Sequence, residues 1–430
     1  MADSLENPCL TPTSRTALAA CLRTVRDGYS LPREYYTSTE VFEWDRLAVW
    51  QSGWLFAAHL CELREPGSFV VVNLFNDSIL VWHDPQHGLS AYHNICRHRG
   101  MRICADSAGQ RSSWTCPYHR WSYGGGGKLI SSPGMGLGFD PRDHGLLPVR
   151  MEEVAGLVFM HLGQNPPDFA PARAALAAEL LPHDLPNTKV AHCIEYLVPA
   201  NWKLIIENNR ECYHCLANHP EYTSATYDVE RDRGDPQREL AMRLSAARDN
   251  WQTAGVASHQ ANYSSDMSGE WYRANRTPLK EGFLTESLDG QPVAPRLGKL
   301  LTYDAGTARI TTFPNYWCHA NSDHAVATQV LPVSPDSTRI RVSWLVRDTA
   351  QQDKDYTLAR LLPFWQKTSE QDWELCQAQQ HGVNSHYYQP GPYSPQMEKN
   401  VKQFVLWYLD QLATLLALPE NPPVQLAQSL

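Results

Sequence analysis

The sequence predicts an α+β fold in two parts: a small antiparallel β domain, then a larger domain in which helices flank an antiparallel sheet. The first part is indicated by short apolar runs before residue 95, which turn pairs such as Asn76-Asp77 and His87-Gly88 separate. The second part is indicated by long helical segments beyond residue 200 that alternate with strands. At 430 residues the chain is long enough for two or three domains.

The first part begins with a helical lead-in at residues 1–40, with a helix over Ser14–Val25. A second helical segment, Val41–His59, opens the β domain, which we place at residues 41–165. Short β-like runs separated by turn residues then predict four strands: Phe69–Leu74, Ser78–His83, Leu89–Asn94 and Gly156–Leu162. We expect Gln164–Pro186, rich in Pro and Ala, to be a linker.

The second part, residues 166–430, opens with a strand at Val190–Val198 and a mainly helical segment at Asn201–His219. Asp228–Leu300 is polar and predicted to be irregular, which is long for a connection and suggests a functional segment. The remaining periodic runs predict three strands, at Ala308–Phe313, Ala325–Pro332 and Thr338–Val346. They also predict two helices, at Gln351–His381 and Met397–Leu416.

The composition is that of an ordinary globular protein. The net charge of −9 argues against a nucleic-acid-binding surface, and no apolar run approaches the length of a membrane span. Residues 1–27 have no continuous apolar core, so we expect no signal peptide. The 11 cysteines are scattered, which predicts a reducing, cytoplasmic location.

Two loops each supply one cysteine and one histidine: Cys96 with His98, and Cys116 with His119. The pairs are separated by 17 residues. Two thiolates on one iron and two imidazoles on the other are the ligands of a Rieske [2Fe–2S] cluster. Zinc is the alternative, but zinc sites usually run Cys-Cys and then His-His.

The residues around these loops resemble those of Rieske non-haem iron oxygenases, specifically the large (α) subunit. The shared residues are Arg99-Gly100 after the first pair, and Trp121, Tyr123, Gly127 and Leu129 after the second. Respiratory Rieske proteins join their two loops by a disulfide, but here only Cys104 is available and Tyr118 occupies the partner position. The resemblance implies a Rieske domain at 41–165, a helix-grip-like catalytic domain at 166–430, and a lead-in packed on the catalytic domain.

A second metal site is predicted at His214 and His219. On a regular helix the two would point about 140° apart, but Pro220 favours a break just before it. Two histidines and one carboxylate form the facial triad of non-haem Fe(II). The family resemblance assigns the third ligand to Asp372, with Glu370 and Glu374 as local alternatives. Taken alone, the pair would be two ordinary, partly buried histidines.

Glu211 lies three residues before His214, where the family has a carboxylate, more commonly Asp. The resemblance implies that it hydrogen-bonds a cluster histidine of the neighbouring subunit and a histidine at the mononuclear iron. It also implies a head-to-tail homotrimer. The alternative is a solvated carboxylate paired with Arg210.

The glutamate is similar to that of family members acting on quaternary amines such as glycine betaine, carnitine, choline and stachydrine. The implied reaction is oxidative N-demethylation with O₂, glycine betaine being favoured. A cationic substrate would contact aromatic faces, for which the candidates are Tyr263, Trp271, Tyr272, Tyr316 and Trp317. No strand is followed by a GxGxxG motif, so we expect NAD(P)H and flavin only on a separate flavin/ferredoxin-type reductase.

Two alternative functions remain open from the sequence. An aromatic-acid ring-hydroxylating dioxygenase would use the same metal ligands with a different pocket. A Rieske electron-transfer or sensor protein without O₂ chemistry would leave about 250 residues after the cluster domain unexplained.

Overall fold

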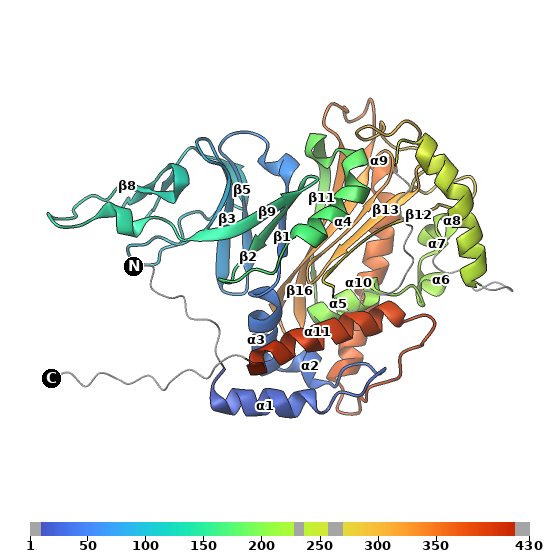
Figure 1. Ribbon diagram of the computed structural model, residues 1–430, viewed down its shortest axis with the longest axis horizontal. Helices are drawn as coiled ribbons and strands as arrows, with labels where there is room; N and C mark the ends of the chain where they lie inside the picture. The colour runs from blue at the N-terminus through green and yellow to red at the C-terminus, as the bar shows by residue number, and fades with distance from the viewer. Residues whose placement is uncertain (1–9, 228–235, 257–269, 418–430) are drawn as a thin grey trace.

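The computed structural model describes residues 10–227, 236–256 and 270–417. A β domain lies at one end of the molecule, and a sheet flanked by helices forms the rest (Figure 1). The β domain has a seven-stranded antiparallel sheet in the order β1-β10-β9-β4-β3-β2-β5. Its strands are β1 Leu55–His59, β2 Ser68–Leu74, β3 Asp77–Asp84, β4 Gly88–His93, β5 Ala108–Gln110, β9 Pro148–Val154 and β10 Leu157–His161.

A small three-stranded sheet, β6-β7-β8, extends from this domain. Its strands are β6 Trp114–Thr115, β7 Ser122–Tyr123 and β8 Leu129–Ser131.

The second domain is built on a six-stranded antiparallel sheet in the order β11-β16-β15-β14-β13-β12. Its strands are β11 Thr188–Val198, β12 Tyr272–Thr277, β13 Thr307–Thr312, β14 Tyr316–Ala320, β15 Ala325–Ser334 and β16 Ser337–Arg347. The predicted α+β class, a small β domain followed by a helix-flanked antiparallel sheet, is confirmed.

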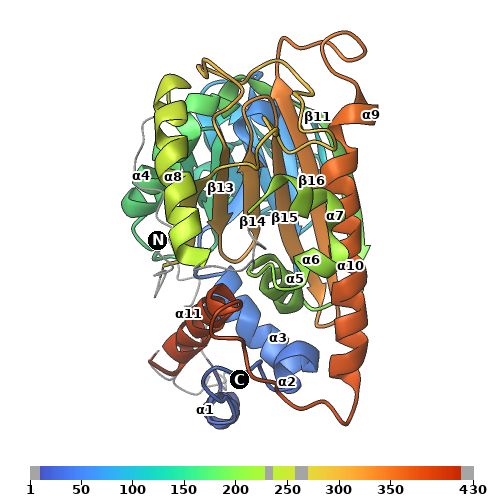
Figure 2. The ribbon, with the colours of Figure 1, turned by 90° about the vertical axis from the view of Figure 1, so that its right-hand side faces the viewer.

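Helices cover one face of this sheet, the face visible in Figure 2. They are α5 Trp202–Asn209, α6 Cys215–Asn218, α7 Pro220–Ala225 and α10 Pro363–Asn384. On the other face, helix α4 (Ala170–Leu180) and the β domain pack against the sheet, and Phe56 of β1 stacks on Tyr316 of β14 at 4.0 Å between ring centres. The sheet therefore separates the helices of one face from the β domain on the other.

The remaining helices are α1 Pro12–Leu22, α2 Glu34–Thr37, α3 Thr39–Asp45, α8 Pro236–Thr253, α9 Leu358–Leu361 and α11 Lys399–Ala417. A buried carboxylate joins three of the helices. Asp45, at the end of α3, accepts hydrogen bonds from Trp202 Nε1 at 3.0 Å and from Tyr408 Oη at 2.6 Å. It also forms a fully buried ion pair with Lys203. Asp45 thus links α3 and α11 to α5.

Two predictions for the first part of the chain were wrong. Val41–His59 is not one helix, because α3 and a π-helical turn at Arg46–Trp50 are followed by strand β1. All five residues of β1 are buried, so the run lacks the alternation that distinguishes a strand from a helix. The predicted linker contains helix α4, whose alanines have high helix propensity and whose Leu176 and Leu180 enter the core.

Three predictions for the second domain also need correction. The segment predicted to be irregular, Asp228–Leu300, contains α8 and β12. The prediction of three strands missed the short β14, and the helix predicted from Gln351 begins later, as α9 and then α10. The start of α10 at Pro363 follows from the preference of proline for the first helical turn. None of the helices in the described ranges is long and apolar enough to cross a membrane.

Candidate metal centres

Two loops of equivalent backbone geometry carry the Cys-His pairs. The N–H of Cys96 donates to the carbonyl five residues later at 2.8 Å, and Gly100 N–H donates back to Cys96 at 3.0 Å. Cys116 and Arg120 repeat both bonds at the same distances. Gly100 and Arg120 have φ of +72° and +60°, which closes each turn. The repeated turn places the two pairs in the same way at the tip of each loop.

The four side chains fit a [2Fe–2S] cluster. Cys96 and Cys116 are buried, and the partly exposed rings of His98 and His119 are 4.7 Å apart. Nδ1 of each histidine is buried without a hydrogen-bond partner in the described ranges, so each ring has a nitrogen to offer a metal. The hydroxyl of Tyr123 lies 3.2 Å from Cys96 Sγ. Hydrogen bonds to the cluster sulfurs tune the reduction potential of such a group.

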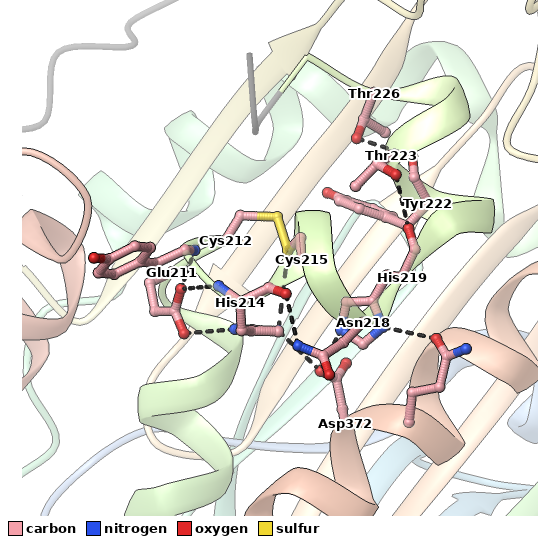
Figure 3. Close-up of a disulfide and its surroundings, with 12 residues drawn as sticks. Glu211, Cys212, His214, Cys215, Asn218, His219, Tyr222, Thr223, Thr226 and Asp372 are labelled. Carbon is pink, nitrogen blue, oxygen red and sulfur yellow. Dashed lines mark hydrogen bonds and ion pairs between the residues drawn. A yellow bond between two sulfur atoms is a disulfide. The ribbon is translucent and has the colours of Figure 1, made fainter. Parts of the chain in front are cut away.

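The second predicted metal site brings two imidazoles and one carboxylate together (Figure 3). Asp372 Oδ1 lies 2.9 Å from His219 Nε2 and 3.2 Å from His214 Nε2. Cys215 Sγ is also 3.9 Å from His214 Nε2, but it is bonded to Cys212 and is not a thiolate. The set available to a metal is therefore two histidines and one carboxylate, the facial triad that suits Fe(II).

The two histidines flank the single-turn helix α6, one at each end, and their rings lie 5.0 Å apart. Helix α5 ends at Asn209, and α6 does not begin until Cys215, so His214 lies in the turn between them. His219 has φ −125° and ψ 70°, outside helical geometry, immediately before Pro220. The proline excludes α geometry at His219. Asp372 comes from α10, which crosses the same face of the sheet.

The electrostatics of this site favour a cation. Burial would lower the pKa of His214, but its hydrogen bonds to Asp372 and Glu211 outweigh burial and raise it to about 9. Burial likewise opposes the effect of Asp372 on His219, whose pKa is nevertheless raised. For Asp372 itself the two histidines overcome burial and lower the pKa. A divalent metal ion would supply the positive charge that protons supply in its absence.

Glu211 holds the first of these histidines. Its Oε1 lies 2.5 Å from His214 Nδ1, and its Oε2 accepts from the backbone N–H of Tyr213 and, at 3.3 Å, of His214. The bond to Nδ1 fixes the tautomer that leaves Nε2 for a metal. The structure thus shows one of the two contacts expected of Glu211, the contact to a histidine of the triad.

A disulfide between Cys212 and Cys215 spans the segment that contains His214 (Figure 3). The scattered spacing of the cysteines gave no indication of this bond. Cys104 is a free, buried cysteine whose sulfur lies 3.6 Å from the Asp106 carbonyl. The sequence-based expectation of an unbridged loop at the cluster is consistent with this contact.

Of the four predicted aromatic residues that the structure describes, Trp317 is the one on the helix-covered face of the sheet. Trp317 lies 6.4 Å from Trp373, the residue that follows Asp372. Tyr316 points to the opposite face, against Phe56, because neighbouring strand residues alternate. The others are Trp271, which packs on Phe159 and Phe169, Tyr272, whose ring lies beside Trp271, and Tyr263, which lies outside the described residues.

Sequence reasoning missed several polar and aromatic residues near the triad. Gln371 Oε1 accepts a hydrogen bond from His219 Nδ1 at 2.7 Å and orients that ring. Its position next to Asp372 was the signal available. Tyr222 of α7 lies 6.4 Å from His319 of β14 and 5.7 Å from Trp365 of α10. No local spacing relates these three residues.

Comparisons with known proteins agree with this arrangement. Residues 53–139 match the model of the Rieske [2Fe-2S] domain, and residues 185–414 match that of the ring hydroxylating alpha subunit (catalytic domain). The chain is 37% identical over 417 residues to the glycine betaine monooxygenase oxygenase subunit of Chromohalobacter salexigens, covering 96% of this chain and 93% of that protein. The Pseudomonas aeruginosa subunit of the same name is 34% identical over 403 residues, covering 93% and 92%.

A solved structure of the quaternary ammonium Rieske monooxygenase CntA has the same fold. It superposes with a TM-score of 0.68 at 20% identity, covering 94% of this chain and 99% of that one. Sequence, fold and paired metal sites together give one conclusion. The chain belongs to the α subunits of the Rieske non-haem iron oxygenases, with a Rieske [2Fe–2S] cluster in its β domain and a mononuclear iron in its catalytic domain.

Proposed function

We propose that this protein is the oxygenase component of a monooxygenase that removes an N-methyl group from a quaternary ammonium compound, glycine betaine being favoured. The convergence of His214, His219 and Asp372 on one point supports O₂ chemistry at this position. The similarity over nearly the whole chain to two glycine betaine monooxygenase subunits supports the substrate.

The reaction inserts one oxygen atom of O₂ into a C–H bond of an N-methyl group, and the resulting carbinolamine collapses to formaldehyde and the tertiary amine. The second oxygen atom takes up two electrons and two protons and leaves as water. From glycine betaine the products would be dimethylglycine, formaldehyde and water. The mononuclear iron, when bound, supplies the coordination positions at which O₂ is activated.

The residues of this chain have separate roles in that reaction. His214, His219 and Asp372 would hold the iron, while Glu211 and Gln371 orient the two imidazoles. Electrons would come from NAD(P)H through a separate flavin/ferredoxin-type reductase and enter at the Rieske cluster. Because NAD(P)H is an intracellular reductant, a cytoplasmic location is part of the proposal.

We also propose that the protein is a homotrimer in which the cluster of one subunit serves the iron of the next. Exposed apolar side chains surround both metal sites: Tyr118 and Met101 beside the cluster, 53% and 41% exposed, and Tyr213 and Leu216 beside Glu211, 48% and 66% exposed. Contact between such surfaces would bury them and bring Glu211 to a cluster histidine. Mass measurement in solution would test this assembly.

A reconstituted assay tests the activity. The purified protein would be combined with a flavin–ferredoxin reductase, NADH, and a panel of glycine betaine, carnitine, choline, stachydrine and aromatic acids. We expect formaldehyde from glycine betaine in proportion to the NADH oxidised. Consumption of aromatic acids alone, without formaldehyde, would instead identify a ring-hydroxylating dioxygenase.

Iron analysis separates the oxygenase from a simple electron carrier or sensor. A Rieske protein without O₂ chemistry would hold about two iron atoms per chain, whereas this protein should hold about three.

A further inference from the structure

A buried carboxylate–histidine pair lies on the face of the sheet that α5, α6, α7 and α10 cover. Glu286 is only 1% exposed, and its Oε1 lies 3.0 Å from Nδ1 of His319 on β14. Its Oε2 accepts from Trp365 Nε1 at 3.0 Å and from Asn321 Nδ2 at 3.2 Å. Because all of these bonds are to one buried carboxylate, Glu286 fixes the orientation of both the imidazole and the indole.

Glu286 is held in its ionised form. Burial would raise its pKa, but the charge and hydrogen bond of His319, the charge of Arg309 and the bond from Asn321 lower it to about 2. The Glu286 carboxylate accepts the hydrogen bond from Nδ1 of His319, so Nε2, the other nitrogen of the ring, faces away from Glu286.

That other nitrogen is available. Within the described ranges Nε2 of His319 makes no hydrogen bond, and the side chain stays 12% exposed although it lies beneath α7 and α10. Arg309 of β13 is directly opposite His319 in the sheet register, and its guanidinium lies 6.0 Å from the ring centre of Tyr222. Two basic side chains are thus adjacent at this position.

The spacing along α10 and β14 gives the distance of His319 from the iron ligands. Trp365 precedes Asp372 on α10 by seven residues, which is two turns, about 10 Å, along the same helix face. On β14, Trp317 and His319 share a face and are about 7 Å apart. Trp317 lies near Trp373 at 6.4 Å, and His319 lies near Trp365 at 4.5 Å. Trp317 and Trp373 therefore lie at the end of this face near Asp372, and His319 and Arg309 lie farther from it.

We propose that His319, positioned by Glu286 and assisted by Arg309, binds the carboxylate of the substrate and selects carboxylated quaternary amines over quaternary amines that lack a carboxylate. In glycine betaine one methylene separates the carboxylate from the trimethylammonium group. With the carboxylate on His319, the methyl groups would lie toward Trp317 and Trp373, at the end where Asp372 stands. The aromatic faces would attract the cation. This inference rests on the proposed function.

Binding of three ligands to the holoenzyme, measured by calorimetry without reductase, tests the proposal. The ligands are glycine betaine, betaine amide, which keeps the trimethylammonium group but has an uncharged carboxamide in place of the carboxylate, and choline. We expect His319→Gln to weaken glycine betaine binding by roughly 10- to 100-fold, as expected for loss of a charge-assisted hydrogen bond, and to change betaine amide and choline less than twofold. Glu286→Gln, which keeps the packing, should weaken glycine betaine in the same selective way by a smaller factor.

His324→Gln is the matched control, because His324 forms a similar buried pair with Asp323, at 2.8 Å, that is fully buried. It should leave the ratio of the three affinities unchanged. If His319→Gln changes the affinities for all three ligands equally, or changes none of them, the proposal is wrong. If His319→Gln does not fold, Glu286→Gln decides: an equal change of the three affinities in that variant would also overturn the proposal. The parallel formaldehyde assay keeps the two questions apart. Wild-type protein that demethylates no amine refutes the function, whereas turnover with unchanged selectivity in the variants refutes only the carboxylate site.

Discussion

Replacement of Glu211 by glutamine tests how the iron site is held. Both carboxylate oxygens accept hydrogen bonds, Oε1 from His214 Nδ1 at 2.5 Å and Oε2 from the backbone N–H groups of Tyr213 and His214. A glutamine of the same length has one acceptor oxygen, and its amide nitrogen would face either the imidazole N–H or the backbone N–H groups. At least one charge-assisted bond becomes a contact between two donors.

The size of the effect follows from those contacts. A hydrogen bond to a charged group contributes about 1.5–3 kcal/mol. Since about 1.4 kcal/mol corresponds to a factor of ten, Glu211→Gln should weaken iron binding at the mononuclear site by roughly 10- to 150-fold. That range agrees with the effect of removing a residue that orients a metal-binding histidine. The Rieske cluster, held by other loops, should be unaffected.

Titration with an iron chelator measures the affinity, while visible absorption of the [2Fe–2S] cluster reports the cluster in the same sample. Glu374→Gln is the control, because Glu374 is exposed on α10, two residues from Asp372. It should bind iron within twofold of the wild type. An unchanged iron affinity in Glu211→Gln would show that the contact to His214 does not support the site.

Three further predictions follow from other features. His214→Ala should keep its cluster but hold about two iron atoms instead of three and release no formaldehyde; an active variant would disprove the assignment of this ligand. Asp45→Asn should destabilise the protein by about 3–5 kcal/mol in denaturant unfolding, because it leaves the buried ammonium of Lys203 without its counter-charge. The pKa of Glu286 is lowered from 4.5 to about 2, so its contribution, about 3 kcal/mol, is present above pH 4.5 and lost as the pH falls toward 2. Between pH 6 and 3 the midpoint temperature of thermal unfolding should therefore fall more steeply for the wild type than for Glu286→Gln. Parallel curves of midpoint temperature against pH would contradict this reasoning.

Short sequence spacings were sufficient to name candidate metal ligands, and the structure brings the candidates of each site close together. A cluster or a facial triad needs particular ligand types, and Cys-x-His, Cys-x-x-His and the break before Pro220 are all local. The fold class followed from the same local patterns. The family assignment, made from the loop residues, is confirmed by the comparisons.

The residues that surround the iron were harder to predict, because packing and not spacing brings them together. Glu286 and His319 are 33 residues apart and meet because the loop that carries Glu286 is hydrogen-bonded to Asn321, immediately after β14. The face to which a strand residue points depends on register, so Tyr316 and Trp317 were equivalent in the sequence and are opposite in the structure. β14 itself has only five residues, although turn residues flank it, Pro314-Asn315 before and Asn321-Ser322-Asp323 after.

The buried Asp45 has a consequence for how the protein is made. Its partners Lys203 and Tyr408 lie far along the chain, so the contacts that fix α5, and the turn leading to the iron ligands, are complete only when α11 has been synthesised. The strands of the β domain end at His161. The 247 residues from there to Tyr408 take roughly 12–50 s to translate at 5–20 residues per second. During that interval the nascent chain can close its β domain and receive a cluster, whereas the contacts that support the iron site wait until α11 has left the ribosome.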